Sequence, residues 1–197
     1  MECNVLNKIT STNIKRAIEY AGIHHKGQFR KSLQKEPMLT HCLNVGDILI
    51  KTGASDSTVV AGILHDTIED TIVSKNNLIT EFGSNVANLV DSVTESPTTK
   101  DWMERCNLYI SKLKKSPVDA MCISAADKID NMRSITDNLM QGYNIFKNMQ
   151  GTPEMQLNKF TEVYKVIKDK VPVKLQSLYE ETLEKFVKIL HQKKNLF

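Results

Sequence analysis

The sequence predicts an all-α fold, a bundle of about eight to ten helices in one domain. Apolar residues recur at spacings of three and four along nearly the whole chain, which is typical of amphipathic helices. No segment has the sustained apolar–polar alternation of a half-buried strand. The 197 residues suit one globular domain with a sizeable core, and no linker divides them. We therefore expect residues 1–197 to form a single domain.

Residues that favour helix starts and ends delimit the individual helices. Ser, Thr and Asp accept hydrogen bonds from the first free backbone amides, and proline suits the first helical position. Glycine ends a helix because it adopts left-handed backbone angles without strain. In chain order, the expected helices cover 14–21 (capped by Ser11 or Thr12), 45–49 (ended near Gly53), 58–66 (capped by Asp56 or Ser57), 75–82 (capped by Ser74 and ended by Gly83), 86–93, 101–115, 117–132, a helix begun by Thr152-Pro153, and a last one after Pro172. The segment 141–151, with glycine near both ends, is expected to be a mobile loop.

Composition and charge narrow the function classes. The formal net charge of +3 is mild, which favours an anionic small molecule over a nucleic acid as the partner. No apolar run approaches the roughly 18–20 residues of a membrane span, and the N-terminal segment lacks the apolar core of a signal peptide. Cys3, Cys42, Cys106 and Cys122 are scattered without a CxxC pair, which favours free thiols in a reducing compartment. We therefore expect a cytoplasmic protein that acts away from membranes.

A short acidic segment that begins with a histidine carries the strongest chemical signal. Residues 65–70 read His-Asp-Thr-Ile-Glu-Asp and follow a strongly apolar stretch. If the helix continues through them, His65 lies above Glu69, and Asp66 lies above Asp70. Carboxylates packed together on such a helix would repel one another without a cation. A divalent metal resolves this conflict, and imidazole with carboxylate oxygens suits Mn, Fe, Co, Ni or Zn.

An ordinary structural role is the alternative for this segment. His65 could be a buried histidine with satisfied hydrogen bonds, beside an exposed acidic helix end. Two observations favour the metal site. Gly62 precedes it by one turn, so a neighbouring helix can come close. His41 and Asp127 also stand at interior-looking positions, where a charged aspartate needs a partner. We therefore expect His41 and Asp127 to complete the metal site.

Two further polar segments could contact a phosphorylated ligand. Arg30 and Lys31 belong to a basic segment just ahead of His41, and phosphate recognition uses such Arg and Lys donors. A solvated loop is the alternative for them. Asn131 lies one helical turn beyond Asp127, and Ser134 follows three residues later, so Asn131 could reach a ligand held at the metal. An ordinary polar helix face remains the alternative there.

Five segments together resemble a known family. They are HKGQFRK, EPMLTHCLNV, AGILHDTIEDT, EFGSNVANLVDSVTE and AADKIDNMRSI, and they fall within residues 17–135. The order His…His-Asp…Asp resembles that of the HD-domain metal phosphohydrolases. HDTIEDT followed by the FG…VT stretch is similar to one branch, the (p)ppGpp hydrolases, which include small alarmone hydrolases and the hydrolase domain of Rel/SpoT enzymes.

The resemblance implies an all-α HD fold and a metal-dependent hydrolase of the stringent response. The implied reaction removes the 3′-pyrophosphate of (p)ppGpp, giving GDP or GTP and pyrophosphate. The implied cofactor is one divalent metal, Mn²⁺, with the ligands His41, His65, Asp66 and Asp127. By the same likeness, the acids that position or activate the attacking water are Glu69 and Asp70.

The resemblance also implies substrate contacts, and here the chain departs from the family. Arg30 and Lys31 match a loop that packs on the guanine base, and Asn131 and Ser134 match residues that line the nucleoside pocket. The departures are Glu36-Pro37-Met38 in place of Gly-x-Pro-Tyr, Cys42 in place of Pro, Ser124 in place of Lys, and Lys159 near the place of a substrate-binding Tyr. These changes bear on substrate preference more than on catalysis.

Two other functions stay open at this stage. The chain could be an HD phosphohydrolase that acts on another nucleotide, such as NADPH as a 2′-phosphatase. It could also be a non-catalytic nucleotide-binding protein, although the intact Glu69-Asp70 pair argues against that function. The final helix is amphipathic and could pair with another subunit in a homo-oligomer, but core packing is favoured for its apolar stripe.

Overall fold

The computed structural model describes residues 11–95 and 101–197, and these residues form an all-α fold. The expected helix count is confirmed. Within the described ranges, the only extended pairing is an isolated bridge between Phe29 and Pro37. In chain order, the described elements are α1 (Thr12–His24), α2 (Met38–Lys51), α3 (Asp56–Ile63), α4 (Thr67–Asp70), α5 (Lys75–Val93), α6 (Trp102–Leu113), α7 (Val118–Met140), the 3₁₀ turn η1 (Ile145–Asn148), α8 (Pro153–Ile167), α9 (Val173–Gln192) and the 3₁₀ turn η2 (Lys194–Leu196).

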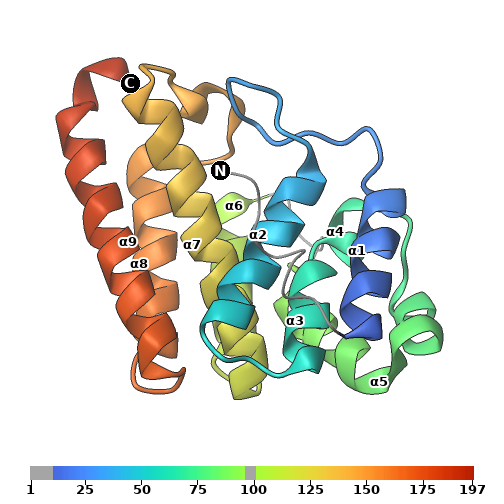
Figure 1. Cartoon of the computed structure of the whole chain (residues 1–197). Coiled ribbons are helices and arrows are strands. Elements are labelled where there is room, and N and C mark those ends of the chain that lie inside the picture. The colour runs from blue at the N-terminus through green and yellow to red at the C-terminus, as the bar shows by residue number, and fades with distance from the viewer. Residues whose placement is uncertain (1–10, 96–100) are drawn as a thin grey trace.

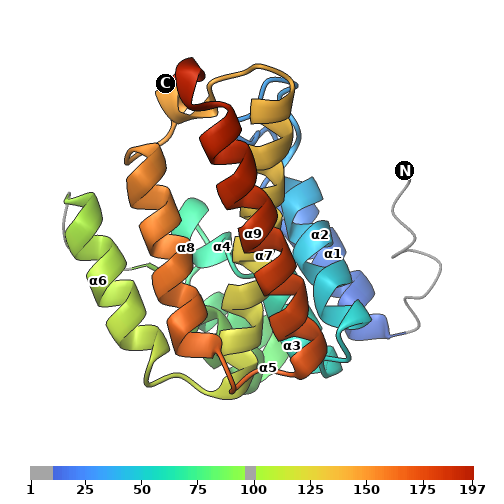
Figure 2. The ribbon, with the colours of Figure 1, turned by 90° about the vertical axis from the view of Figure 1, so that its left-hand side faces the viewer.

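Helix α7 runs through the middle of the bundle (Figures 1 and 2). It contacts α2, α3 and α5 on one side and α8 and α9 on the other. All residues from Ala120 to Asp130 are buried, so polar side chains of α7 need partners inside the protein. The apolar stripe of α9, including Tyr179 and Phe186, packs into this core, as the sequence favoured. Among the described residues, no helix is both long and apolar enough to cross a membrane.

Two glycines let α2 and α3 approach closely. A methyl group added at Gly62 would lie 2.3 Å from Cδ1 of Leu49, and one added at Gly46 would lie 2.8 Å from Cγ1 of Ile63. Only residues without a side chain leave this space, so Leu49 and Ile63 pack directly against the backbone of the facing helix. The predicted close approach at Gly62 is therefore confirmed. It brings the first turn of α2 beside the end of α3, where the predicted histidines stand.

The helix predicted over 58–66 ends earlier than expected. It starts after Ser55, whose Oγ accepts the amide of Thr58 at 3.3 Å, and it ends at Ile63. A turn over 64–66 then leads to the separate helix α4. The turn forms because Thr67 donates both its amide (3.0 Å) and its hydroxyl (2.6 Å) to the carbonyl of Leu64, which replaces the regular helical bond. The expected continuous helix through residues 58–66 is wrong, and so is the choice of Asp56 or Ser57 as the cap. The amide of Asp70 still donates to the carbonyl of Asp66 at 2.8 Å, as in a helix.

Other local predictions hold with small changes. Gly83 breaks the regular helix as predicted, but as a kink within α5, with φ 85° and ψ 163°. The side chains of Ser74 and Thr152 cap α5 and α8 as predicted. The segment 141–151 contains η1, whose Ile145 is buried in the core, and the mobility expected of this segment stays a prediction.

The cysteines agree with the prediction of free thiols where the structure describes them. Cys42, Cys106 and Cys122 are buried and unpaired within the described ranges. Cys3 lies outside the described residues.

Candidate metal centre and nucleotide pocket

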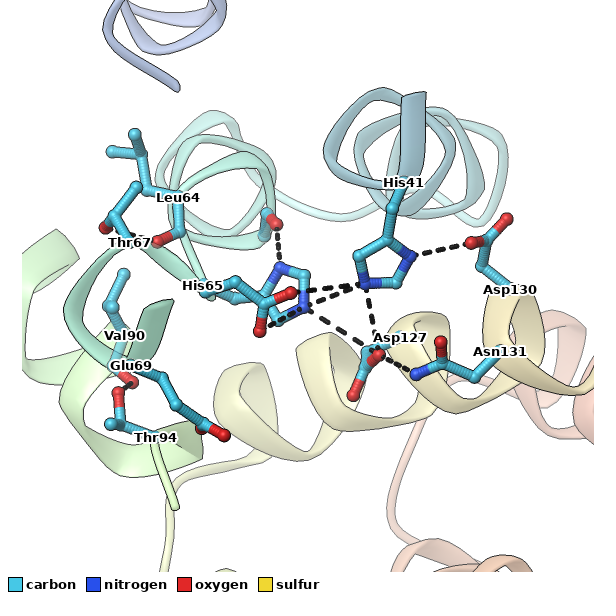
Figure 3. A network of polar contacts seen from close by, with 12 residues as sticks. His41, Leu64, His65, Thr67, Glu69, Val90, Thr94, Asp127, Asp130 and Asn131 are labelled. Carbon is cyan, nitrogen blue, oxygen red and sulfur yellow. Dashed lines mark hydrogen bonds and ion pairs between the residues drawn. The ribbon is translucent and has the colours of Figure 1, made fainter. Parts of the chain in front are cut away.

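Two histidines from adjacent helices face each other at the centre of the site (Figure 3). His41 lies in the first turn of α2 and His65 in the turn after α3, and both are buried. Nδ1 of His65 lies 2.8 Å from the carbonyl oxygen of Gly62, and Nδ1 of His41 lies 2.7 Å from Oδ2 of Asp130. Both partners are acceptors, so each Nδ1 is the donor. Nη1 of Arg30 also lies 3.1 Å from Nδ1 of His41, but the carboxylate of Asp130 is closer and Arg30 donates to that same carboxylate, so Nδ1 keeps its hydrogen. In the neutral rings both Nε2 atoms then carry lone pairs, and they face each other at 3.2 Å.

Two aspartates bring further acceptors to the same point. Oδ1 of Asp127 lies 3.3 Å from Nε2 of His41 and 3.7 Å from Nε2 of His65. Asp66 places its oxygens 3.5 Å and 3.1 Å from the same two nitrogens. Ligand atoms about 2.0–2.2 Å from one first-row metal ion are roughly 3.0–3.4 Å apart, so these separations suit a shared cation. The described residues offer His41, His65 and Asp127 as one metal-binding group, and Asp66 adjoins it.

The charges of this cluster also favour a cation. Burial lowers the pKa of His41 and His65, but the neighbouring carboxylates outweigh it, and both pKa values are raised. Burial raises the pKa of Asp66, but His65 outweighs it and holds this pKa at about 2. Lys128 and both histidines hold the pKa of Asp127 well below its usual range in spite of burial. The cluster therefore attracts positive charge between its two rings, as a proton or as a metal.

The predicted acidic pair lies beside the cluster on α4. Burial and Asp66 raise the pKa of Glu69 to about 7, and the same two causes raise that of Asp70. Oε2 of Glu69 accepts the backbone amide of Glu95 at 3.0 Å, which holds the carboxylate in place. Gln28 donates its side-chain amide to the backbone oxygen of Asp70 at 2.7 Å. An acid with a pKa near neutral is suited to accept a proton at physiological pH.

All of the predicted site residues line one pocket. Its volume is about 420 Å³, within the range of small-molecule sites. The fold thus gathers four separate segments of the chain around one cavity. The predicted residues in its lining are Arg30, Lys31, His41, His65, Asp66, Glu69, Asp70, Asp127, Asn131 and Ser134.

The arrangement of two histidines and two aspartates in this order on a helical bundle is matched by a known family. Residues 17–146 match the family model described as HD domain. The chain belongs to the HD domain family. The resemblance seen in the sequence motifs is therefore confirmed.

Individual relatives of this HD domain carry informative names. The chain is 35% identical over 135 residues to the guanosine-3′,5′-bis(diphosphate) 3′-pyrophosphohydrolase MESH1 of Drosophila melanogaster, covering 68% of this chain and 75% of that protein. It is 37% identical over 130 residues to a GTP pyrophosphokinase of Streptomyces coelicolor, of which the match covers only 15%.

Solved structures agree with these relatives. One is described as a metazoan ortholog of SpoT that hydrolyses ppGpp and plays a role in starvation responses; it matches with a TM-score of 0.75 and 28% identity over 95% of this chain and 98% of the other. A second is the lmo0812 protein of Listeria monocytogenes, with a TM-score of 0.66 and 27% identity over 78% of this chain and 97% of the other.

The predicted substrate-binding residues of the HD domain differ in how firmly they are held. Arg30 forms an ion pair with Asp130 and donates to Oδ1 of Asn131 at 3.0 Å, and its side chain is only 9% exposed. Asn131 in turn donates to Asp127, so it does lie beside a predicted metal ligand. Lys31 is exposed at the pocket edge. Arg30 is thus part of the pocket wall, whereas Lys31 is free to adjust to a ligand.

Three basic residues complete the pocket and were not predicted as site residues. Arg105, Lys128 and Lys159, which we call the basic cluster, come from α6, α7 and α8. Nζ of Lys128 lies 2.5 Å from Oδ2 of Asp127, and Nζ of Lys159 lies 2.5 Å from Oε1 of Glu95. The position of Lys128 next to Asp127 was a usable signal in the sequence. Lys159 stood out only as a departure from the family, and its place in the pocket depends on how α8 packs.

Asp130 is the other residue that sequence reasoning missed. Its side chain is buried and accepts hydrogen bonds from His41, Arg30 and Asn44, the last at 2.9 Å. The hydrogen bonds outweigh burial and hold its pKa below the usual range, so the carboxylate is ionised. Asp130 lies three residues after Asp127 on the same helix, but its partner His41 is 89 residues away.

Proposed function

We propose that this chain hydrolyses the 3′-pyrophosphate of (p)ppGpp, giving GDP or GTP and pyrophosphate. The observation that carries the proposal is the convergence of two imidazole and two carboxylate groups beside Glu69 in a pocket that also holds basic residues. The names of the relative from Drosophila melanogaster and of the solved metazoan protein support the same substrate. A pocket of about 420 Å³ has room for a nucleotide.

We propose one divalent metal, Mn²⁺, as the cofactor. The ligands would be His41, His65, Asp66 and Asp127, because their free lone pairs and charges converge. When bound, such an ion lowers the pKa of a coordinated water and polarises a phosphate oxygen.

The side chains around that centre would then perform the proton and charge steps. Glu69 accepts the proton of the attacking water, and Asp70 orients that water. The oxygen of water bonds to phosphorus, the bond from phosphorus to the 3′-oxygen breaks, and that oxygen leaves with a proton as the 3′-hydroxyl. Lys128 and Lys159 offset the negative charge of the pyrophosphate.

The nucleoside would bind on the other side of the cluster. Arg30 and Lys31 pack on the guanine base, and Asn131 and Ser134 line the nucleoside pocket. The reducing, cytoplasmic setting and a homo-oligomeric state remain predictions. We also propose that residues 1–197 form a single HD-type metal phosphohydrolase domain.

A panel of nucleotides tests the proposal. The Mn²⁺-loaded protein is incubated with ppGpp, pppGpp, GTP and NADPH, and pyrophosphate and orthophosphate are measured separately. We expect pyrophosphate from ppGpp and pppGpp alone, and its loss when a chelator removes the metal. Orthophosphate from NADPH would instead indicate a 2′-phosphatase. Nucleotide binding without any release would indicate a non-catalytic binding protein.

A further inference from the structure

Asp130 contacts the proposed metal ligand His41 from outside the nucleotide pocket. A second cavity of about 570 Å³ lies next to the nucleotide pocket, and Asp130 lines this second cavity. Arg30 lines both cavities and so forms part of the wall between them. Within the part of the chain that the structure describes, Asp130 is not part of the lining of the nucleotide pocket. Its carboxylate can therefore act on the reaction only through the residues that it contacts.

The contact with His41 decides which nitrogen of that ring faces the metal. Oδ2 of Asp130 lies 2.7 Å from Nδ1 of His41, and an ionised carboxylate can only accept a hydrogen bond. Nδ1 must then carry the hydrogen, and in the neutral ring Nε2 is left with the lone pair that points toward His65 and Asp127. Nδ1 of His65 donates instead to the neutral backbone carbonyl of Gly62, which likewise leaves the lone pair on Nε2 of that ring. The two histidines are thus oriented by different means, and at Nδ1 His41 has a charged acceptor whereas His65 has a neutral one.

The same oxygen of Asp130 also accepts from Arg30. Arg30 lies in the segment between α1 and α2, so one carboxylate joins a substrate-binding residue to a ligand of the metal. Asn44 donates to the other oxygen at 2.9 Å, which fixes the carboxylate against rotation. The three donors come from two segments outside α7, and the carboxylate is 7% exposed. Such a satisfied, buried acceptor is rigid enough to set the orientation of a ring.

We propose that Asp130 is a positioning residue of the metal centre, which holds His41 with Nε2 toward the metal and links that ligand to the substrate-binding Arg30. The proposal rests on the proposed role of His41 as a metal ligand, but it does not depend on the identity of the substrate. A carboxylate behind a metal-bound histidine fixes the tautomer and makes the ring a stronger ligand. The alternative is that Asp130 serves only as an ion-pair partner for Arg30.

Metal affinity without any nucleotide separates these two roles. The dissociation constant for Mn²⁺ is measured by titration calorimetry on the full chain and on the variants Asp130→Ala, Asp130→Asn and Arg30→Gln. Asp137→Ala is the matched control, because Asp137 is an exposed aspartate of the same helix that also lines the second cavity. Thermal unfolding of each metal-free variant reports any purely structural damage.

The expected loss of Mn²⁺ affinity differs among the variants. Asp130→Ala weakens Mn²⁺ binding by about 10- to 100-fold, as loss of such outer partners typically does. Asp130→Asn weakens it less, because its amide oxygen still accepts from Nδ1 of His41. Arg30→Gln and Asp137→Ala bind Mn²⁺ like the unchanged protein. If Asp130→Ala fails to fold, the Mn²⁺ affinities of Asp130→Asn and Arg30→Gln are compared instead, and only Asp130→Asn is expected to bind Mn²⁺ more weakly.

Two results would overturn the proposal. One is unchanged Mn²⁺ affinity in both Asp130 variants. The other is an equal loss in Arg30→Gln, which would make the ion pair with Arg30 the important contact. Because no nucleotide is present, this experiment can succeed even if the nucleotide panel gives no pyrophosphate, and the two failures are distinguishable.

Discussion

The metal centre and the basic cluster line the same pocket but are built differently. The proposed metal centre consists of His41, His65, Asp66 and Asp127, which stand on α2, on the turn after α3 and on α7. Those elements pack closely, and each ring nitrogen that faces away from the site has an acceptor of its own. The basic cluster consists of long side chains, Arg105, Lys128 and Lys159, from three helices. The proposed ligands are short side chains that converge on one point, whereas Lys128 and Lys159 are long side chains that ion pairs with Asp127 and Glu95 hold in place.

Two of the departures that the family resemblance indicates, Ser124 and Lys159, lie near the basic cluster. Ser124 replaces a lysine, and its hydroxyl lies 2.6 Å from that of the buried Tyr109. Nζ of Lys159, from α8, lies 5.7 Å from the ring centre of the same Tyr109. The basic group of Lys159, which lines the pocket, thus comes near Tyr109 and Ser124 from another helix. The proposed metal ligands show no such exchange, because any change there would alter the geometry around the ion.

The largest effect should come from the acid next to the metal centre. Glu69→Gln keeps the shape of the side chain but removes the proton acceptor, so kcat is expected to fall by about 10²–10⁴-fold. Mn²⁺ content, measured by elemental analysis, should stay unchanged because Glu69 is not a proposed ligand. The control is Glu162→Gln, at a solvent-accessible glutamate of α8. Pyrophosphate release at the unchanged rate by Glu69→Gln would contradict the acid role.

A smaller effect is expected in the basic cluster. Lys159→Met removes one positive charge, and a charge-assisted hydrogen bond to phosphate is worth roughly 1.5–3 kcal/mol. KM for ppGpp should therefore rise about tenfold or more, while Mn²⁺ affinity stays the same.

Lys165→Met on the same helix is the matched control for this prediction, since the Lys165 side chain is 64% exposed. It should change neither KM nor Mn²⁺ affinity. A drop in Mn²⁺ affinity for Lys159→Met would mean that the basic cluster and the metal centre are not separable.

The close approach of α2 and α3 can be broken by a single methyl group. Gly62→Ala places Cβ against the fully buried Leu49, and such overpacking typically costs about 1–3 kcal/mol of unfolding free energy. Mn²⁺ affinity should fall as well, because His41 and His65 are carried by these two helices. Chemical denaturation and calorimetry measure the two effects.

Gly22→Ala serves as the matched control for Gly62→Ala. Gly22 lies within α1, and the added methyl group would stand at an ordinary contact distance of 3.5 Å from Cδ2 of Leu39. Alanine is the better helix former, so this variant should be neutral or slightly more stable. Equal destabilisation of both variants would show that the α2–α3 contact has no special importance.

The mildest test is the dependence of activity on pH. Glu69 must be ionised to accept a proton, and its pKa is raised to about 7. Lowering the pH protonates it, so kcat/KM is expected to fall as the pH drops through 7, by about tenfold per unit below that. Protons also compete with the metal for His41 and His65, whose pKa values are raised, and that effect has the same sign. Metal content is therefore measured at each pH, and a flat profile at constant metal content would contradict Glu69 as the base.

Sequence patterns alone predicted the helical fold and the set of candidate site residues. Helix periodicity and capping are local properties, so Thr152 and Pro172 marked helix starts correctly and Gly83 marked a break in the regular helix. Imidazole and carboxylate groups in apolar surroundings are costly without a partner, which singled out His41 and Asp127. All of the residues selected in this way line one pocket, and their individual roles remain predictions.

Only the tertiary structure decided how those residues are held. The turn at 64–66 depends on side chains that satisfy the carbonyls at the end of α3, and helical periodicity cannot detect it. Asp130 looks like any polar residue of α7 until α2 places His41 against it, and Lys159 enters the pocket only because α8 packs on α7. Such pairings join segments far apart in the chain. Their energies depend on burial and distance, which local sequence patterns do not contain.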